Sequence, residues 1–424
     1  MRTRHPGRVT TGPVVAQVPG GRKKEVTMRP VEIVEGVYWV GALDPQLRVF
    51  DIIMKADHGT TYNSYLVKAG EKVAVVDTVK EPFYEEFLEN VRSLVDPRDV
   101  SYVIVNHTEP DHSGSLGRFL RDAPNARVVC DRNCRNFVRN ILNRDVDPIL
   151  VQDGDTLDLG GGVEMRFVHA PFLHWPDTMF TYLEQRKILF TCDFLGAHYC
   201  DDRLFDDLVD DYSHAFEYYY LVIFRPFKKY VLEALDKVQG LDLGVIAPSH
   251  GPILRSDPRA YMEKYREWSS SPVPGEEKSL LVFYASAYGN TAALAEKIAE
   301  GARSEGVKVT VMDVAATELG LMIDRIEAAD GIAVGSATIN GDAVEPVWYL
   351  LSHLATLNLK GKVGAAFGSY GWSGEAPKLI ADRLRGLKFK VEEEPLRVNL
   401  VPTEEDLEAA KEMGRRLARS LRAG

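Results

Sequence analysis

A cluster of metal-binding residue types stands in the segment VIVNHTEPDHSGSLGR, residues 103–118. An apolar run is followed by His107, Glu109, Asp111 and His112 within six residues. Imidazole nitrogens and carboxylate oxygens crowded so closely would repel one another, or stay unsatisfied when buried, unless a cation neutralises them. We therefore predict a metal site here, against the simpler interpretation of a solvated polar loop.

The elements around this cluster must present it at one point. Residues 102–105 have the apolar character of a short buried strand, and Pro110 and Gly114 predict a loop at the carboxyl end of that strand. Residues 116–122 predict the start of a helix behind the loop. A loop between a strand and a helix can aim several side chains at the same place.

Other residues farther along the chain have the character needed to complete the site. His174 lies in APFLHWPDT, Asp193 ends the strand-like run ILFTCD, and His250 lies in VIAPSHGP, where another apolar run stops at a turn. Added to the first cluster, these ligands exceed the needs of one ion. We predict a dinuclear centre in which one carboxylate bridges both metals.

The remaining histidines and the cysteines give weaker signals. His169 falls inside the apolar run MRFVHA, which favours a packed or capping role, whereas His198 in DFLGAHYC could stand behind the ligands or line a substrate pocket. The chain has no C-x2-C pair, and its cysteines are expected to be buried thiols in a reducing compartment. These cysteines are Cys130, Cys134, Cys192 and Cys200.

Composition restricts the class of protein. A length of 424 residues, at about 150 residues per domain, predicts two or three domains. Hydrophobic content of 45%, charged content of 27% and a net charge of -11 are typical of a cytoplasmic globular protein and argue against nucleic acid or an anionic membrane as the main partner. No run approaches the roughly 18 apolar residues of a membrane span. Residues 1–27 have no signal-peptide core and are expected to be a disordered tail or a start-site extension.

The region from residue 28 to residue 268 reads as one α/β body. Residues 32–77 alternate strand-like runs, FDIIM among them, with turn residues, which predicts consecutive antiparallel strands. Helical periodicity follows at residues 82–95, and a further helix is predicted near residues 133–142. Strands outnumber helices, and every candidate ligand lies at a strand end.

A linker, SSSPVPGEEK at residues 269–278, separates this body from a second domain at residues 279–424. The second domain opens with an apolar strand, a small-residue loop and an amphipathic helix. Ser286, Asn290 and Thr291 offer donors, Gly289 lets a ligand approach the backbone, and the helix N-terminus favours an anion. The pattern predicts a phosphate cradle.

The rest of the second domain is typical of a doubly wound α/β sheet. Strands predicted near residues 307–314, 331–335 and 363–367 alternate with helices, and the last helix carries a capping signature from Thr403 to Asp406. Ligands of such sheets bind at the carboxyl ends of the strands, where Tyr370 and Trp372 could cover a flat ring. The predicted cofactor-binding residues are Ser286, Ala287, Tyr288, Gly289, Asn290, Thr291, Ser336, Ala337, Thr338, Ile339, Asn340, Ser369, Tyr370, Gly371, Trp372, Ser373 and Gly374.

The metal constellation resembles that of the metallo-β-lactamase superfamily, H-x-H-x-D-H followed by a His, a bridging Asp and a last His. Glu109 replaces the second His, and H-x-E-x-D-H resembles the variant of flavodiiron proteins, whose more anionic ligands favour iron over zinc. The resemblance implies a catalytic diiron site with His107, Glu109 and His174 on one iron, Asp111, His112 and His250 on the other, and Asp193 bridging. In that family the position of His112 can be weakly bound or unbound.

The second domain resembles flavodoxin, with the FMN phosphate on residues 286–291 and the ring between the two later loops. Together the two resemblances cover residues 28–424 and imply an αββα sandwich followed by a flavodoxin-like doubly wound parallel sheet. They further imply a cytoplasmic oxidoreductase that reduces O2 to water, NO to N2O, or both. The implied partners are a redox donor, such as rubredoxin or a reduced deazaflavin coenzyme, and a second copy in a head-to-tail homodimer or dimer of dimers.

Two other functions stay open on the sequence alone. A metal-dependent hydrolase of the same superfamily would use a metal-bound hydroxide, although Glu109 and the fused second domain count against it. A pure electron carrier would leave the metal-binding residues without a function. A flavodoxin-like domain that has lost its cofactor would leave the phosphate cradle without one. Metal analysis together with an anaerobic gas-consumption assay distinguishes these functions.

Overall fold

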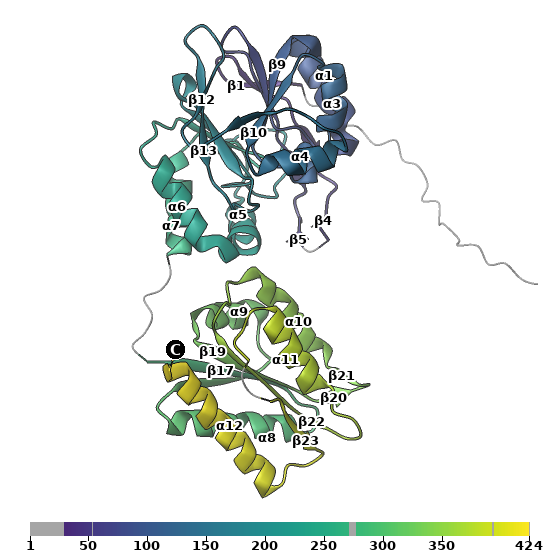
Figure 1. Ribbon diagram of the computed structural model, residues 1–424, viewed down its shortest axis with the longest axis vertical. Helices are drawn as coiled ribbons and strands as arrows, with labels where there is room; N and C mark the ends of the chain where they lie inside the picture. Colours follow the sequence, from purple (N-terminus) through teal and green to yellow (C-terminus); the bar gives the residue numbers. More distant parts are fainter. Residues whose placement is uncertain (1–28, 53, 271–276, 392–393, 424) are drawn as a thin grey trace, which may run out of the picture.

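The computed structural model describes residues 29–52, 54–270, 277–391 and 394–423. Two lobes follow one another along the chain, the first built on two packed sheets and the second on a single parallel sheet (Figure 1). The expected tail at residues 1–27 lies outside the described residues, as does most of the expected linker. The last helix before that linker ends at Ser269, and the first strand after it begins at Ser279.

The first lobe contains a seven-stranded and a five-stranded sheet. The seven-stranded sheet has the order β1 (Val31–Val34), β2 (Val37–Trp39), β7 (Tyr65–Val67), β8 (Val73–Val76), β9 (Val100–Val105), β10 (Arg127–Asp131) and β11 (Ile149–Val151). The five-stranded sheet has the order β12 (Thr156–Asp158), β13 (Glu164–His169), β14 (Met179–Leu183), β15 (Ile188–Cys192) and β16 (Val245–Pro248). The strands from β1 to β8 pair antiparallel as predicted, whereas β8 to β11 pair parallel.

Successive side chains along a strand point to opposite faces of its sheet, which explains why each sheet has a core on both faces. Ile104 of β9 and Phe190 of β15 point into the core between the sheets, whereas Val103 and Leu189, one position away, point into the core beneath the helices. The helices are α1 (Tyr84–Leu94), α2 (Pro110–Ser113), α3 (Leu116–Asp122), α4 (Cys134–Leu142), α5 (Ser213–Tyr219), α6 (Lys228–Val238) and α7 (Pro258–Ser269). The predicted αββα sandwich is confirmed.

The segment that carries the first candidate ligands is more regular than predicted. We expected an irregular loop between Pro110 and Gly114, but the structure has the short helix α2 there. Pro110 occupies its first turn, and the carbonyl oxygen of Glu109 accepts hydrogen bonds from the backbone N–H groups of His112 and Ser113. A proline is well suited to that position because its missing N–H would have no partner there.

A second difference concerns the run FDIIM, which we expected to be a single strand. The structure has the hairpin strands β4 (Val49–Phe50) and β5 (Met54–Lys55), with the backbone reversing between them. Asp51 has a φ of 47° and Ile52 a φ of 69°, both in the left-handed region. An apolar run contains no signal for such a turn, because its residues lack the Gly or Asn that usually marks one.

The second lobe is a five-stranded parallel sheet with helices on both faces, and the predicted flavodoxin-like doubly wound sheet is confirmed. The strand order is β18 (Lys308–Asp313), β17 (Ser279–Ala285), β19 (Gly331–Ser336), β22 (Val363–Tyr370) and β23 (Leu396–Asn399). One face packs on α8 (Asn290–Ser304) and α12 (Glu404–Ala423), and the other on α9 (Leu319–Ala328), α10 (Glu345–His353) and α11 (Ala376–Gly386). In the predicted cap, Thr403 and Asp406 each accept a hydrogen bond from the other's backbone N–H.

Among the described residues, no helix combines the length and the apolar character needed to cross a membrane.

Candidate functional site

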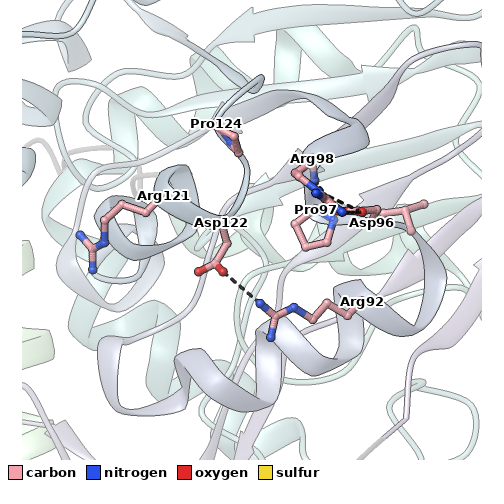
Figure 2. A pocket seen from close by; sticks show the side chains of 8 residues that line it. Arg92, Asp96, Pro97, Arg98, Arg121, Asp122 and Pro124 are labelled. Atoms are coloured by element: carbon pink, nitrogen blue, oxygen red, sulfur yellow. Dashed lines mark hydrogen bonds and ion pairs between the residues drawn. The ribbon is translucent and has the colours of Figure 1, made fainter.

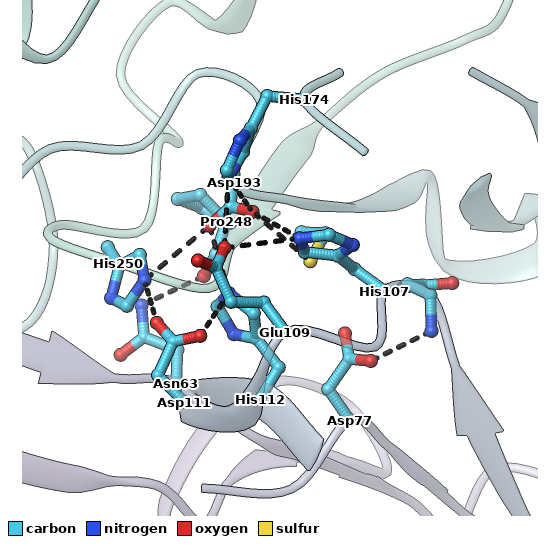
Figure 3. Close-up of polar contacts among 12 residues, drawn as sticks. Asn63, Asp77, His107, Glu109, Asp111, His112, His174, Asp193, Pro248 and His250 are labelled. Atoms are coloured by element: carbon cyan, nitrogen blue, oxygen red, sulfur yellow. Dashed lines mark hydrogen bonds and ion pairs between the residues drawn. The ribbon is translucent and has the colours of Figure 1, made fainter. Parts of the chain in front are cut away.

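The first group of candidate ligands lies where separate segments of the first lobe meet. His107, Glu109, His174 and Asp193 each offer an atom, and these atoms lie within 4.8 Å of one another. Oε2 of Glu109 lies 2.9 Å from Nε2 of His174 and 3.3 Å from Nε2 of His107. The structure therefore brings these predicted ligands together (Figure 3).

A second group lies beside the first. Asp111, His112 and His250 also offer atoms within 4.8 Å of one another, and all three side chains are buried. Oδ2 of Asp111 lies 2.9 Å from Nε2 of His250, and Oδ1 lies 3.3 Å from Nε2 of His112. His112, the least secure of the expected ligands, thus has its ring nitrogen in the group.

Asp193 stands between the two groups. Its Oδ1 lies 3.0 Å from Nε2 of His112 and 3.5 Å from Nε2 of His250, on the side of the second group. Its Oδ2 lies 3.4 Å from Nε2 of His107 and 3.7 Å from Nε2 of His174, on the side of the first group. One carboxylate therefore presents one oxygen to each set of ligands.

The strand ends position these side chains. β9 ends two residues before His107, β15 ends one residue before Asp193, and β16 ends two residues before His250. The start of the first loop is fixed by Asp77, whose Oδ1 accepts a hydrogen bond from the backbone N–H of Asn106 at 2.8 Å. Burial raises the pKa of Asp77 to about 7, although the imidazoles of His112 and His107 oppose that shift.

Oxygen atoms of other residues lie behind two of the imidazoles. Nδ1 of His250 lies 2.6 Å from the carbonyl oxygen of Thr61, and Nδ1 of His107 lies 3.4 Å from Oδ1 of Asp177. Asp177 is itself held by the backbone N–H of Thr108 at 3.0 Å. A proton on Nδ1 of His250 leaves its Nε2 as a bare lone pair facing the cluster, which is the usual arrangement of metal-binding histidines. Nδ1 of His107 has no hydrogen-bond partner among the described residues.

The contact between His250 and Asp111 shows whether the residues of the site fit a bound cation. A carbonyl oxygen can only accept, so the contact with Thr61 puts the proton of a neutral His250 on Nδ1. Its bare Nε2 then faces Oδ2 of Asp111 at 2.9 Å. Both carboxylate oxygens of Asp111 are buried and have no hydrogen-bond partner among the described residues. Two lone pairs at that distance repel unless a cation lies between them, so these residues fit a metal ion.

The pKa shifts describe the same excess of negative charge. Burial opposes charge on Asp193, but the imidazoles of His112, His107 and His174 hold its pKa well below the ordinary value. Burial likewise opposes a proton on His107, yet Asp177, Glu109 and Asp193 raise the pKa of this imidazole well above its usual range. The cluster attracts positive charge, and bound cations would supply it.

Sequence reasoning missed several residues that contact Asp193. The hydroxyl of Tyr219, at the end of α5, donates to Oδ1 of Asp193 at 3.1 Å. The thiol of Cys192 lies 3.9 Å from Oδ2, and burial raises the pKa of this thiol, so it remains a donor. Cys192 could have been found because it adjoins Asp193. Tyr219 is separated from it along the chain and carries no such signal.

Two histidines outside the ligand groups behave differently. His169 lies 2.9 Å from Oδ2 of Asp131, away from the cluster, in agreement with its predicted structural role. His198 is buried beside the site: its ring centroid lies 5.0 Å from that of His250, and its Nδ1 shares a hydrogen bond of 2.9 Å with Oγ1 of Thr60. It stands behind the ligands and belongs to neither group.

The predicted phosphate cradle lies between β17 and α8. Gly289, with a φ of 83°, precedes the helix, and the Oγ of Ser286 is shielded from solvent with no hydrogen-bond partner among the described residues. Oγ1 of Thr291 and Oγ of Ser369 share a hydrogen bond of 2.8 Å, which joins the first and third predicted loops. A free hydroxyl beside a helix N-terminus fits a bound phosphate.

The other two predicted loops are partly regular structure. Thr338–Ile339 is the short strand β20, paired with β21 (Asp342–Ala343), and Ser369 and Tyr370 are still in β22. One face of the Tyr370 ring lies 5.6 Å from the guanidinium of Arg397, whereas Trp372 is 83% exposed. All three segments lie at the carboxyl edge of the parallel sheet, where β17, β19 and β22 end.

A hollow of about 590 Å³ in the first lobe contains none of the predicted ligands (Figure 2). Arg92 pairs with Asp122 at 3.0 Å, and Arg98 pairs with Asp96. The charged side chains that line this hollow therefore largely compensate one another, and we assign no ligand to it.

Comparison with known families divides the chain in the same way. The family described as ODP family beta lactamase matches residues 60–251, and the family described as Flavodoxin matches residues 282–414. The chain is 47% identical over 396 residues to type A flavoprotein fprA of Rhodobacter capsulatus, covering 92% of this chain and 91% of that protein. It is 43% identical to flavo-diiron protein FprA2 of Clostridium acetobutylicum, covering 93% and 100% of the two chains.

Two further relatives are named for reactions. The nitric oxide reductase of Moorella thermoacetica is 37% identical, with 92% of this chain and 98% of that protein covered. The structure of rubredoxin oxygen:oxidoreductase from Desulfovibrio gigas matches with a TM-score of 0.68 and 31% identity, covering 93% of this chain and 99% of that one.

The fold and the site together define a metallo-β-lactamase-like domain joined to a flavodoxin domain. This combination extends over 92% of the chain in relatives well above 30% identity. The chain belongs to the flavodiiron protein family, also called type A flavoproteins.

Proposed function

We propose that this protein is an oxidoreductase that reduces O2 to water, NO to N2O, or both. The observation that carries the proposal is the position of Asp193, whose two oxygens face two separate groups of ligands. A mononuclear site would not need a carboxylate shared in this way. The names of the relatives from M. thermoacetica and D. gigas support both gases as substrates.

In this proposal the metal ligands divide as the two groups do. One iron would be held by His107, Glu109 and His174, the other by Asp111, His112 and His250, and Asp193 would be shared by both groups of ligands. Anionic oxygen ligands favour iron over zinc. Bound together, two irons and one FMN supply the capacity to bind the gas and to deliver the electrons for its reduction.

The remaining residues of the site position the ligands and limit access by water. Thr61 keeps Nε2 of His250 facing the cluster, and the carboxylate of Asp177 lies behind His107. The ring of Trp175 stands edge-on to His107, with the centroids 5.1 Å apart, and covers one side of that imidazole. Tyr219 donates to Asp193 and so stabilises its negative charge.

The FMN would bind at the carboxyl edge of the second sheet. Ser286, Asn290 and Thr291 are the proposed phosphate contacts, because the free hydroxyl of Ser286 lies beside the start of α8. The exposed rings of Tyr288 and Trp372, 94% and 83% accessible, are available to contact the flavin or a partner.

The orientation of the second lobe favours electron transfer between two copies of the chain. The first lobe contacts Glu327 at the end of α9, close to the amino end of β19, which begins at Gly331. The proposed FMN loops lie at the opposite end of that strand, roughly 20 Å away at about 3.3 Å per residue. We therefore propose a head-to-tail homodimer, supplied with electrons by a separate donor such as rubredoxin or a reduced deazaflavin.

Metal and flavin analysis of the isolated protein tests the proposal. We expect about two irons and one FMN per chain when the protein is produced with iron available. Stoichiometric zinc without iron would favour a hydrolase instead.

A further inference from the structure

One contact between the two lobes is an ionic cluster centred on Arg225. This residue opens the short helix η5 (Arg225–Phe227) of the first lobe and is only 7% exposed. Its Nε and Nη2 donate to Oε2 of Glu327 at 3.1 Å and 2.8 Å, and Nη2 also donates to Oδ1 of Asp324 at 2.9 Å. Lys228 contacts the other oxygen of Glu327, Oε1, at 2.8 Å. Both oxygens of one carboxylate are thus held by cations of the other lobe.

In the second lobe, hydrogen bonds from Lys362 hold the backbone at Glu327. Nζ of Lys362, which precedes β22, donates to the carbonyl oxygens of Glu327, at 2.9 Å, and of Ala329. These carbonyl groups lie at the carboxyl end of α9, which carries partial negative charge. A displacement of Glu327 would therefore also disturb the end of α9 and the start of β19.

On the side of the first lobe, Arg225 is continuous with the candidate metal site. The π-helical turn η4 (Tyr220–Phe224) joins it to α5, whose last residue, Tyr219, donates to Asp193. The hydroxyl of Tyr220 shares a hydrogen bond of 2.8 Å with Oγ of Ser269, which ties the same turn to α7. Only the five residues of η4 separate Arg225 from Tyr219, the residue that donates to Asp193.

We propose that Arg225 is a positioning residue that fixes the orientation of the flavodoxin-like lobe relative to the metal site. A buried guanidinium with directed hydrogen bonds to two carboxylates defines a geometry, whereas apolar contacts would allow the lobes to slide. Removal of Arg225 leaves Glu327 with Lys228 alone, and removal of Glu327 leaves the buried Arg225 with the exposed carboxylate of Asp324 alone, so either change is expected to loosen the lobe orientation. The consequence for intersubunit electron transfer rests on the proposed function. The role of Arg225 in fixing the lobe orientation does not depend on that function.

The test is a double-mutant cycle with Arg225→Gln, Glu327→Gln and the double variant, and Lys229→Gln as the control. Lys229 is on the neighbouring turn but pairs within its own lobe, with Glu233 at 3.6 Å and with 80% of its side chain exposed. Hydrogen exchange in α9 and small-angle scattering of the full chain are the readouts. We expect exchange at residues 319–328 to rise about tenfold and the scattering to show a wider spread of lobe orientations in both single variants.

The double variant should be less affected than the sum of the two single variants, because both substitutions remove the shared contact between Arg225 and Glu327. Lys229→Gln should behave as the unsubstituted protein. Additive effects in the double variant, or unchanged exchange and scattering in Arg225→Gln, would overturn the inference. Circular dichroism shows whether each variant is folded, and Arg225→Lys, which keeps the charge but not the two-pronged geometry, gives a milder second variant.

Iron content, flavin content and gas consumption separate this inference from the proposed function. If the protein reduces O2 or NO, donor-driven turnover should fall roughly tenfold in Arg225→Gln while iron and FMN stay bound. If the protein holds no iron but the lobe orientation responds as described, the proposed function is wrong and the positioning role of Arg225 is supported. If turnover is normal in a variant whose lobes are demonstrably loose, the positioning role is wrong.

Discussion

The hydroxyl of Tyr219 donates to Oδ1 of Asp193 at 3.1 Å, inside a largely buried cluster of imidazoles and carboxylates. Oδ1 is the oxygen that faces His112 and His250, so this tyrosine acts on the side of the second ligand group. A hydrogen bond to a charged acceptor contributes about 1.5–3 kcal/mol, enough to affect how that carboxylate shares its charge between two metals.

Tyr219→Phe should therefore lower turnover by roughly tenfold while the metal content is kept, because one donor is lost but all ligands remain. Gas consumption and metal analysis of the same preparation measure both. Tyr218→Phe, one residue away, removes a hydroxyl whose one hydrogen bond among the described residues comes from the backbone N–H of Lys55 at 3.4 Å, and should be close to neutral. Equal effects of the two substitutions would contradict the assigned role.

Asp193→Ala should lower iron occupancy and abolish gas reduction while FMN remains bound. The substitution removes the carboxylate shared by both ligand groups and leaves the buried cations short of negative charge. Asp153→Ala, which removes a half-exposed carboxylate from the same lobe, should retain iron. Normal iron content and normal turnover in Asp193→Ala would show that this residue does not bridge two metals.

Ser286→Ala should weaken FMN binding about tenfold, because the free Oγ of Ser286 is the hydroxyl best placed to donate to a phosphate. Fluorescence titration of the apoprotein with FMN measures the affinity. Ser304→Ala, at the far end of α8, removes a hydroxyl that donates to the carbonyl oxygen of Gly301 and serves as the control. An unchanged FMN affinity in Ser286→Ala would place the phosphate elsewhere.

His169 gives a prediction about pH. Its hydrogen bond with Asp131 raises the pKa of this imidazole despite partial burial. A group with a raised folded-state pKa stabilises the fold fully below its unfolded pKa of about 6.5, and this contribution disappears as the pH rises through the folded pKa. His169→Gln should therefore cost about 1 kcal/mol of unfolding free energy near pH 5.5 and less above pH 8.

Urea unfolding at the two pH values checks that prediction, with His214→Gln, which removes an exposed imidazole, as the control. A larger destabilisation at the higher pH would reverse the sign and rule out the ion pair with Asp131.

Much of the site could be predicted from sequence because several of its ligands directly follow buried strands. His107, Asp193 and His250 each follow an apolar run, and those runs are β9, β15 and β16. The periodicity of apolar residues also indicated the helices and the doubly wound second lobe, whereas the αββα sandwich was implied by the family resemblance. Local chemistry and local pattern were sufficient for these features because each is encoded in neighbouring residues.

The remaining features depend on contacts between distant segments. Tyr219 reaches Asp193, and Arg225 reaches Glu327, only after the chain has folded, and nothing in the residues adjoining them signals the partner. The hairpin at residues 49–55 was likewise missed, since its turn places Asp51 and Ile52 in a left-handed conformation without a glycine.

The division of Asp193 between two ligand groups could be predicted only in outline. The sequence indicated more ligands than one ion needs, but not which oxygen faces which group. That assignment depends on the orientation of a single carboxylate, which the hydrogen bond from Tyr219 and the position of His112 determine.

The measurement that tests the account most directly is gas consumption by the anaerobically reduced, iron-loaded and FMN-loaded protein, compared with its Asp193→Ala variant. The two proteins are mixed separately with NO and with O2, and gas uptake is recorded together with reoxidation of the flavin. The account predicts that the unsubstituted protein consumes at least one of the gases, with oxidation of its flavin, and that Asp193→Ala does not exceed the rate of free reduced FMN. Equal rates in the two proteins with both gases would contradict it.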